Sequence, residues 1–82
     1  MAHTYILFSV TQNKTYVGCT EDVPKRLAQH NQGRVTATHS GRPWIIVMTE
    51  DHPTMLEARR RERYLKSSAG RRWLKKTLGV LQ

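Results

Sequence analysis

The sequence contains one cysteine, few acidic residues and no long hydrophobic run. Cys19 has no second cysteine to pair with, which excludes an internal disulfide and a cysteine-based zinc site. The longest apolar runs, residues 5–8 and 44–48, are far shorter than the roughly 20 residues that span a bilayer, so we expect no membrane partner. The N-terminus also lacks the basic start and cleavable apolar stretch of a signal peptide. These absences predict a soluble protein of the cytoplasm.

A chain of 82 residues is the right length for one domain, and we assign residues 1–82 to it. A domain this small buries only about 60% of the surface that its unfolded chain exposes. We therefore expect a thin core, and a shallow site on the surface rather than a deep pocket.

The charge is strongly one-sided. Fourteen Lys and Arg face six Asp and Glu, giving a net charge of +8. Nine of the fourteen lie within residues 59–76, while the first 24 residues carry only Lys14. Such asymmetry is typical of a protein that binds a polyanion, most often nucleic acid. A solvated face, or a ribosome-associated protein whose charge packs on RNA, would explain the charge equally well.

The first half of the chain predicts a hairpin followed by a helix. Residues 5–10 and 15–20 are rich in β-branched and aromatic side chains, and the short polar segment 11–14 connects them. A helix should begin with Glu21 or Asp22 near its N-cap and Pro24 in its first turn. It should run to about residue 31 and stop at Gly33.

The second half predicts a third strand and two more helices. Residues 34–43 read as a polar loop, and 44–48 as a strand that is central in the sheet or covered on both faces. Thr54 and Glu57 have the spacing of a capping box, so a helix should begin there and continue through residue 66. Residues 67–68 can cap a last helix, whose apolar side is Trp73, Leu74, Leu78 and Leu81. The order β-β-α-β-α-α predicts an α+β fold, with a small three-stranded antiparallel sheet flanked by helices.

The hairpin predicts two faces with different composition. If residues 11–14 form the loop, Val10 pairs with Thr15, and side chains alternate between the two faces. One face is mostly apolar and should meet the core: Ile6, Phe8, Val10, Thr15, Val17 and Cys19. On the other face Tyr5 and Tyr16 converge beside Gly18, which leaves room for a ligand to approach the backbone. This depends on register, and paired tyrosines on a sheet more often serve packing.

Two further groups could carry chemistry or be ordinary surface residues. Arg26 and His30 are four residues apart, so they lie on one face of the predicted helix. Arg recognises phosphate bidentately, and His exchanges protons near neutral pH. Glu62 lies among arginines, where it could pair with Lys66 or hold Mg²⁺ together with water and substrate phosphate.

Together these residues resemble the GIY-YIG nuclease superfamily, particularly its small stand-alone bacterial members. The resemblance covers nearly the whole chain, in five segments that occur in the family's order: His3-Thr4-Tyr5, Tyr16-Val17-Gly18, Lys25 to Asn31 with Arg26, Gly41 to Trp44, and Glu57 to Glu62. The chain departs from the family pattern in two places. It lacks the glycine of the first half-motif, and no asparagine follows the predicted metal-binding glutamate.

The resemblance implies a one-metal hydrolysis of phosphodiester bonds. Glu62 would bind Mg²⁺ or Mn²⁺, and Glu57 would keep only its capping role. The catalytic residues would be Tyr5, Tyr16, Arg26 and His30, with Arg26 neutralising charge on the phosphate and one tyrosine activating water. A tyrosine can act as a base only if nearby cations lower its pKa. His39 lies where some relatives have a further histidine, and could equally be a loop residue.

We therefore expect a metal-dependent DNA endonuclease that is structure-selective or weakly sequence-specific. The alternative is a non-catalytic nucleic-acid-binding module that retains the nuclease fold. Specificity would come from DNA shape, from a protein partner or from a homo-oligomer. The residues expected to contact nucleic acid are Gly18, Arg34, Arg42, Arg59, Arg60, Arg63, Lys66, Arg71 and Arg72.

Overall fold

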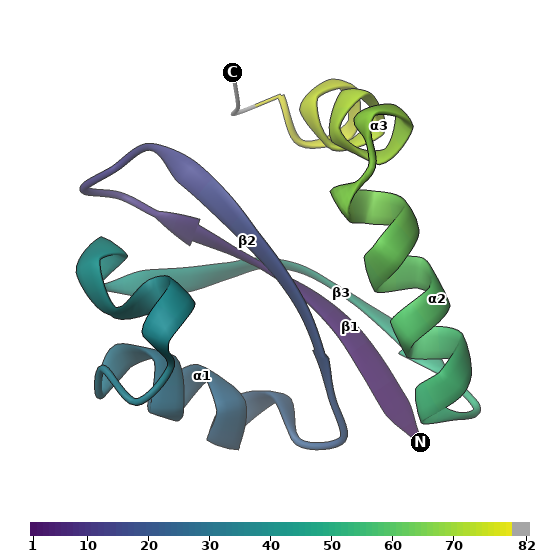
Figure 1. Cartoon of the computed structure of the whole chain (residues 1–82), viewed down its shortest axis with the longest axis horizontal. Helices are drawn as coiled ribbons and strands as arrows, with labels where there is room; N and C mark the ends of the chain where they lie inside the picture. The colour runs from purple at the N-terminus through teal and green to yellow at the C-terminus, as the bar shows by residue number, and fades with distance from the viewer. Residues whose placement is uncertain (80–82) are drawn as a thin grey trace.

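The computed structural model describes residues 1–79, and its elements follow the predicted order (Figure 1). The strands are β1 (Ala2–Ser9), β2 (Lys14–Thr20) and β3 (Trp44–His52), and the helices are α1 (Val23–Asn31), α2 (Met55–Lys66) and α3 (Ser68–Leu78), with a 3₁₀ helix η1 (Thr36–Gly41) before β3. The three strands form one antiparallel sheet in the order β2-β1-β3. The predicted α+β class is confirmed. Leu81, predicted on the apolar side of the last helix, lies outside the described residues.

The sheet is covered by helices on both faces, with α1 on one side and α2 and α3 on the other (Figure 1). On the α2 side, Ile6 and Val17 pack with Leu65 and Leu74. On the α1 side, a second cluster contains Tyr5, Leu7 and Trp44, with Tyr16, Leu27 and Ile46 packed against it. The face of Ile6 meets the core as predicted, and the tyrosine face is packed as well.

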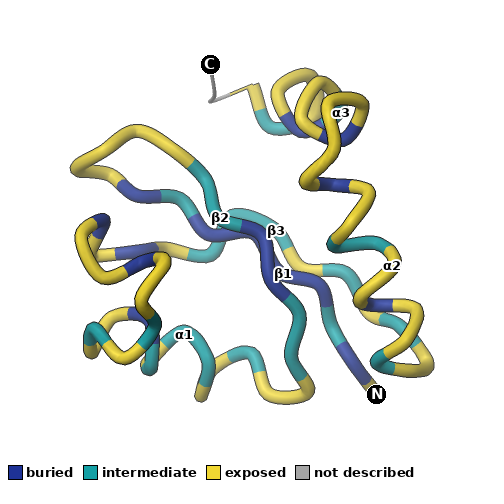
Figure 2. Tube along the Cα trace, viewed as in Figure 1, coloured by how far each residue is buried: buried dark blue, intermediate teal, exposed yellow. Residues whose placement is uncertain are grey.

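The central strand is β1, which pairs with β2 and β3 and is almost continuously buried (Figure 2). Of the two alternatives for residues 44–48, the central strand is wrong, because β3 lies at the edge of the sheet and leaves Ile45 48% exposed. Side chains of β3 do pack into the clusters on both faces of the sheet. β3 is also longer than predicted and ends at His52. Its register with β1 shifts between Ile6 and Leu7, a β-bulge that accommodates one extra residue in β3.

The hairpin closes earlier than predicted, because Ser9 pairs with Lys14 instead of Val10 with Thr15. Asn13 adopts a left-handed φ of 52°, a conformation that Asn tolerates better than most residues. Its N–H donates to the Ser9 carbonyl at 2.8 Å, which fixes the turn. Val10 is left 60% exposed, outside the core. Each pair differs from the predicted sum of residue numbers by two, so the alternation of faces is unchanged.

The helix boundaries follow local capping, much as predicted. The Asp22 side chain accepts from the N–H of Lys25 at the start of α1, and Gly33 after the helix has a φ of 78°. Thr54 caps α2 by accepting from the N–H of Glu57, and Ser67 caps α3. The predicted loop of residues 34–43 contains η1, which closes over α1. No helix within residues 1–79 is long and apolar enough to cross a membrane.

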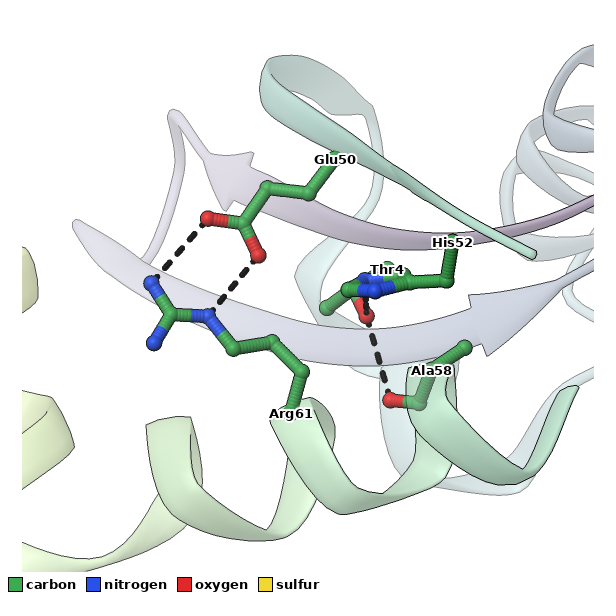
Figure 3. Close-up of polar contacts among 5 residues, drawn as sticks. All are labelled: Thr4, Glu50, His52, Ala58 and Arg61. Atoms are coloured by element: carbon green, nitrogen blue, oxygen red, sulfur yellow. Dashed lines mark hydrogen bonds and ion pairs between the residues drawn. The ribbon is translucent and has the colours of Figure 1, made fainter. Parts of the chain in front are cut away.

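Polar contacts fix α2 against the sheet (Figure 3). The Arg61 guanidinium binds both carboxylate oxygens of Glu50 on β3, at 2.8 and 3.1 Å. The Thr4 hydroxyl on β1 donates to the Ala58 carbonyl at 3.1 Å, and lies 2.9 Å from Nε2 of His52. Because the hydroxyl's only hydrogen goes to Ala58, the His52 ring must donate to Thr4. These contacts set the position of α2, and therefore the position of Glu62, which lies one helical turn after Ala58.

Candidate active site

A buried chain of hydrogen bonds connects β1, α1 and η1. The Tyr5 hydroxyl lies 2.8 Å from Nε2 of His30, and Nδ1 of His30 lies 2.7 Å from the Thr38 hydroxyl. The Thr38 hydroxyl donates onward to the Val35 carbonyl at 3.4 Å. Thr38 must then accept from Nδ1, which leaves Nε2 of the neutral ring to accept from Tyr5. All three side chains are at most 2% exposed, so this chain is part of the core.

Burial keeps both members of the Tyr5–His30 pair neutral. It raises the pKa of Tyr5 to about 12, although the hydrogen bond and charge of Arg26 act in the opposite direction. Burial, together with the nearby Arg26 charge, lowers the pKa of His30 to about 4. A base role for Tyr5 would require nearby cations to lower its pKa, but in this structure the pKa lies above its ordinary value. At neutral pH the proton therefore stays on Tyr5.

The space beside Gly18, which the sequence suggested for a ligand, is taken up by Tyr5. The two residues pair directly across β1 and β2. A Cβ at Gly18 would overlap the phenol of Tyr5, and Gly18 itself is buried. The missing side chain thus makes room for the Tyr5 phenol beside the neighbouring strand, and leaves no open approach to the backbone.

Tyr16 lies closer to the surface than Tyr5. Its ring makes edge contacts with His30 and Trp44, at centroid distances of 5.1 and 6.4 Å. It is partly exposed and lines a surface depression that also includes Lys66 and Arg71. The Lys66 ammonium lies 5.4 Å from the centre of the Tyr16 ring. Tyr16 points to the α1 side of the sheet and Lys66 comes from the α2 side, so they meet around the edge of β2.

Arg26 reaches the same edge from α1. Its guanidinium donates to Gln29 at 3.0 Å and lies close enough to Tyr5 to influence the pKa of that residue. Arg26 also lines a depression together with Cys19, at the end of β2. The predicted pairing of Arg26 and His30 on one face of α1 fits this arrangement: His30 points into the core and Arg26 lies at its margin.

Glu62 faces β2 from α2. Its Oε1 accepts from the Cys19 thiol at 3.0 Å and its Oε2 from the Lys66 ammonium at 2.8 Å. Burial opposes ionisation of Glu62, but these two hydrogen bonds and the charge of Arg59 outweigh it and hold its pKa below the ordinary value. Burial and the carboxylate raise the pKa of Cys19 to about 11, so the thiol keeps its proton. Glu62 is therefore an ionised carboxylate among cations.

The chain offers a divalent cation one carboxylate at this position. No cluster of three or more His, Cys, Asp or Glu within residues 1–79 could hold a metal ion by itself. Glu62 opens onto a depression lined by Arg59, Arg63, Lys66 and Ser67. One ionised carboxylate beside a cationic surface fits a Mg²⁺ or Mn²⁺ ion whose remaining ligands are water and substrate phosphate.

The predicted nucleic-acid contacts divide into two groups. Arg59, Arg63, Lys66 and Arg71 line the depressions beside Glu62 and Tyr16. The three depressions described above do not include Arg34, Arg42, Arg60 or Arg72. Arg42 donates to the carbonyl of His39 at 2.8 Å. His39 is exposed on η1, and the partner of His30 is instead its neighbour Thr38.

Three contacts at the site were missed in the sequence. Thr38 orients His30, Cys19 donates to Glu62, and Asn31 holds the start of β3 through two hydrogen bonds with the backbone of Trp44, at 2.7 and 3.1 Å. The alternation of β2 placed Cys19 on the face opposite Tyr16, which is the face that α2 covers. That pattern could have indicated a contact with α2. Thr38 gave no comparable signal.

The fold is that of a small α+β domain. Residues 1–76 match the model of the GIY-YIG catalytic domain, and the chain belongs to the GIY-YIG family. A solution structure of a UPF0213 protein from Bacillus halodurans is similar, with 28% sequence identity and a TM-score of 0.55 over 96% of this chain and 87% of that one. No curated protein is a significant match. The family match identifies the chain as an endonuclease domain.

Proposed function

We propose that this protein is a divalent-metal-dependent endonuclease that hydrolyses phosphodiester bonds in DNA, with selection by DNA shape or by weak sequence preference. One observation carries the proposal. Around the edge of β2, an arginine from α1, tyrosines from β1 and β2, a histidine and an ionised carboxylate from α2 lie close together in a domain of nuclease type. Because the proposed substrate is DNA, we expect the protein to act inside the cell.

Each residue of the candidate site would have its own role in hydrolysis. Arg26 binds the scissile phosphate and neutralises the charge that develops on it. Tyr16, the more exposed tyrosine, orients the attacking water and, as the phenolate, takes its proton to become the neutral phenol. Tyr5 and His30 both stay neutral, and from the core they hold Tyr16 and Arg26 in place. Glu62 holds the cation, which supplies electrostatic stabilisation of the phosphate when bound.

The cationic side chains along α2 and α3 would position the DNA backbone without reading bases. Arg59, Arg63, Lys66 and Arg71 line the depressions beside the site and are the first candidates. The selection of a cleavage site would come from DNA geometry, from a protein partner or from a second copy of the chain.

The test is cleavage of branched, nicked, single-stranded and duplex DNA with Mg²⁺ or Mn²⁺. Glu62→Gln should reduce the rate by at least about 100-fold, the scale on which single charge-stabilising groups contribute to catalysis. Glu57→Gln is the matched control, because this exposed carboxylate lies on the same helix and only its backbone N–H serves the cap. Cleavage that survives in EDTA, or unchanged in Glu62→Gln, would contradict the metal mechanism. Tight binding with no cleavage of any substrate would favour a non-catalytic binding module.

A further inference from the structure

The cation nearest to the proposed metal ligand is part of the protein itself. The Lys66 ammonium lies 2.8 Å from Oε2 of Glu62, one helical turn away on α2. Both carboxylate oxygens already accept a hydrogen bond, because Cys19 donates to Oε1. A divalent ion bound to this carboxylate would lie beside a positive charge and be repelled by it. Lys66 and a metal ion therefore compete for Glu62.

Lys66 also lies where it could release the carboxylate without leaving the site. It lines the depression of Glu62, Arg59 and Arg63, and it lines the depression of Tyr16 and Arg71. No other residue is shared by the two. Its side chain is 49% exposed, and its ammonium is within 5.4 Å of the centre of the Tyr16 ring. A lysine has a flexible stem and three donors, so it can exchange a carboxylate oxygen for a phosphate oxygen nearby.

We propose that Lys66 couples metal binding to the arrival of the substrate phosphate. Without nucleic acid, the Lys66 ammonium holds Glu62 and disfavours the divalent ion. A phosphate beside Tyr16 draws the ammonium off Oε2, and Glu62 then becomes available to the metal. By thermodynamic linkage, DNA must raise the metal affinity by the same factor as the metal raises DNA affinity. This inference rests on the proposed role of Glu62 as the metal ligand.

The first measurement is Mn²⁺ binding to the free protein, followed by the electron paramagnetic resonance signal of unbound Mn²⁺. Lys66→Met keeps most of the stem and should bind Mn²⁺ about fivefold more tightly than wild type, the upper end of what an exposed ion pair contributes. Lys66→Arg keeps the charge and should bind as weakly as wild type. Lys14→Met removes a charge from the start of β2, outside all three depressions, and should change nothing. Thermal melting confirms that each variant is folded.

The second measurement is the affinity for a fluorescent DNA duplex, read by anisotropy in the first seconds after mixing, with and without Mn²⁺. The increase in DNA affinity that Mn²⁺ causes should be smaller in Lys66→Met than in wild type. The increase that remains in Glu62→Gln measures the effect of Mn²⁺ that does not depend on the site. If Glu62→Gln loses Mn²⁺ binding while Lys66→Met binds Mn²⁺ like wild type, the coupling through Lys66 is wrong, but the role of Glu62 as the metal ligand is supported. If Glu62→Gln binds Mn²⁺ like wild type, both proposals fail. Tighter Mn²⁺ binding in Lys66→Arg or Lys14→Met would also overturn the coupling.

Discussion

Acid should destabilise this domain through one buried side chain, His30. The imidazole is fully buried, accepts from Tyr5 and donates to Thr38, and its pKa is lowered from 6.5 to about 4. A group with a depressed pKa in the folded state contributes stability above its unfolded pKa and loses it as the pH falls through the folded pKa. The loss from His30 should therefore occur between pH 6.5 and about pH 4.

The size of this effect follows from the two pKa values. At about 1.4 kcal/mol per pKa unit, the difference between 6.5 and about 4 corresponds to about 3 kcal/mol of folding free energy. For a domain of this size, 1 kcal/mol moves the melting temperature by about 4–8 °C. The His30 contribution should thus lower the melting temperature by more than about 10 °C across this pH range.

The assay is thermal or urea unfolding at a series of pH values, compared between wild type, His30→Gln and His39→Gln. Protonation of carboxylates, Glu62 among them, also destabilises the domain in acid, so the informative quantity is the difference in pH dependence between variants. His30→Gln, whose side chain does not titrate, should lose much of the pH dependence between 6.5 and 4. His39→Gln changes an exposed histidine and should keep it. An NMR titration in which the His30 ring shows an ordinary pKa would refute the reasoning directly.

Two further predictions concern glycines and salt. Gly18→Ala should destabilise the domain by about 1–3 kcal/mol, as overpacking does, and should lower cleavage, because the added Cβ overlaps Tyr5 and displaces its hydroxyl from His30. Gly70→Ala should also lower the melting temperature, because its Cβ would meet the backbone of Leu65. The folded fraction of this variant should still cleave DNA. If Gly18→Ala and Gly70→Ala lose the same activity per folded molecule, the specific role of the Tyr5–His30 contact is contradicted. If about five phosphates are neutralised, the logarithm of the DNA association constant should fall with the logarithm of salt concentration at a slope of about −4.5, and a slope near zero would exclude the cationic surface as the DNA contact.

Much of the arrangement could be predicted from the alternation of side chains in strands and from the residues that cap helices. The side chains of a strand alternate strictly, so Tyr5 and Tyr16 were placed on one face although the hairpin register was off by one residue in each strand. Asp22, Thr54 and Ser67 are good capping residues and mark helix starts that the structure has. These features are local, which is why the sequence alone contains them.

The features that the sequence did not predict depend on how the elements pack. The length of the chain suggested a thin core on one face of the hairpin, whereas a second cluster, to which α1 contributes Leu27, lies over the tyrosine face. That packing buries Tyr5 and raises its pKa, the opposite of the direction that a base at this position would need. The contact of Cys19 with Glu62 joins residues 43 positions apart and depends on where α2 crosses the sheet. The alternation of β2 indicates which face Cys19 lies on, but neither its partner Glu62 nor the burial of Tyr5 has a local signal.

The candidate site lies at the edge of β2, and this position limits how the protein can assemble. An edge strand presents unpaired N–H and C=O groups, to which a strand from another molecule can be added. A strand added to β2 would cover the edge at which the candidate site lies and would compete with the substrate there. Oligomers built by sheet extension must therefore use the opposite edge, β3, or avoid strand pairing altogether. A peptide designed to pair with β2 would be an inhibitor that needs no affinity for the catalytic side chains.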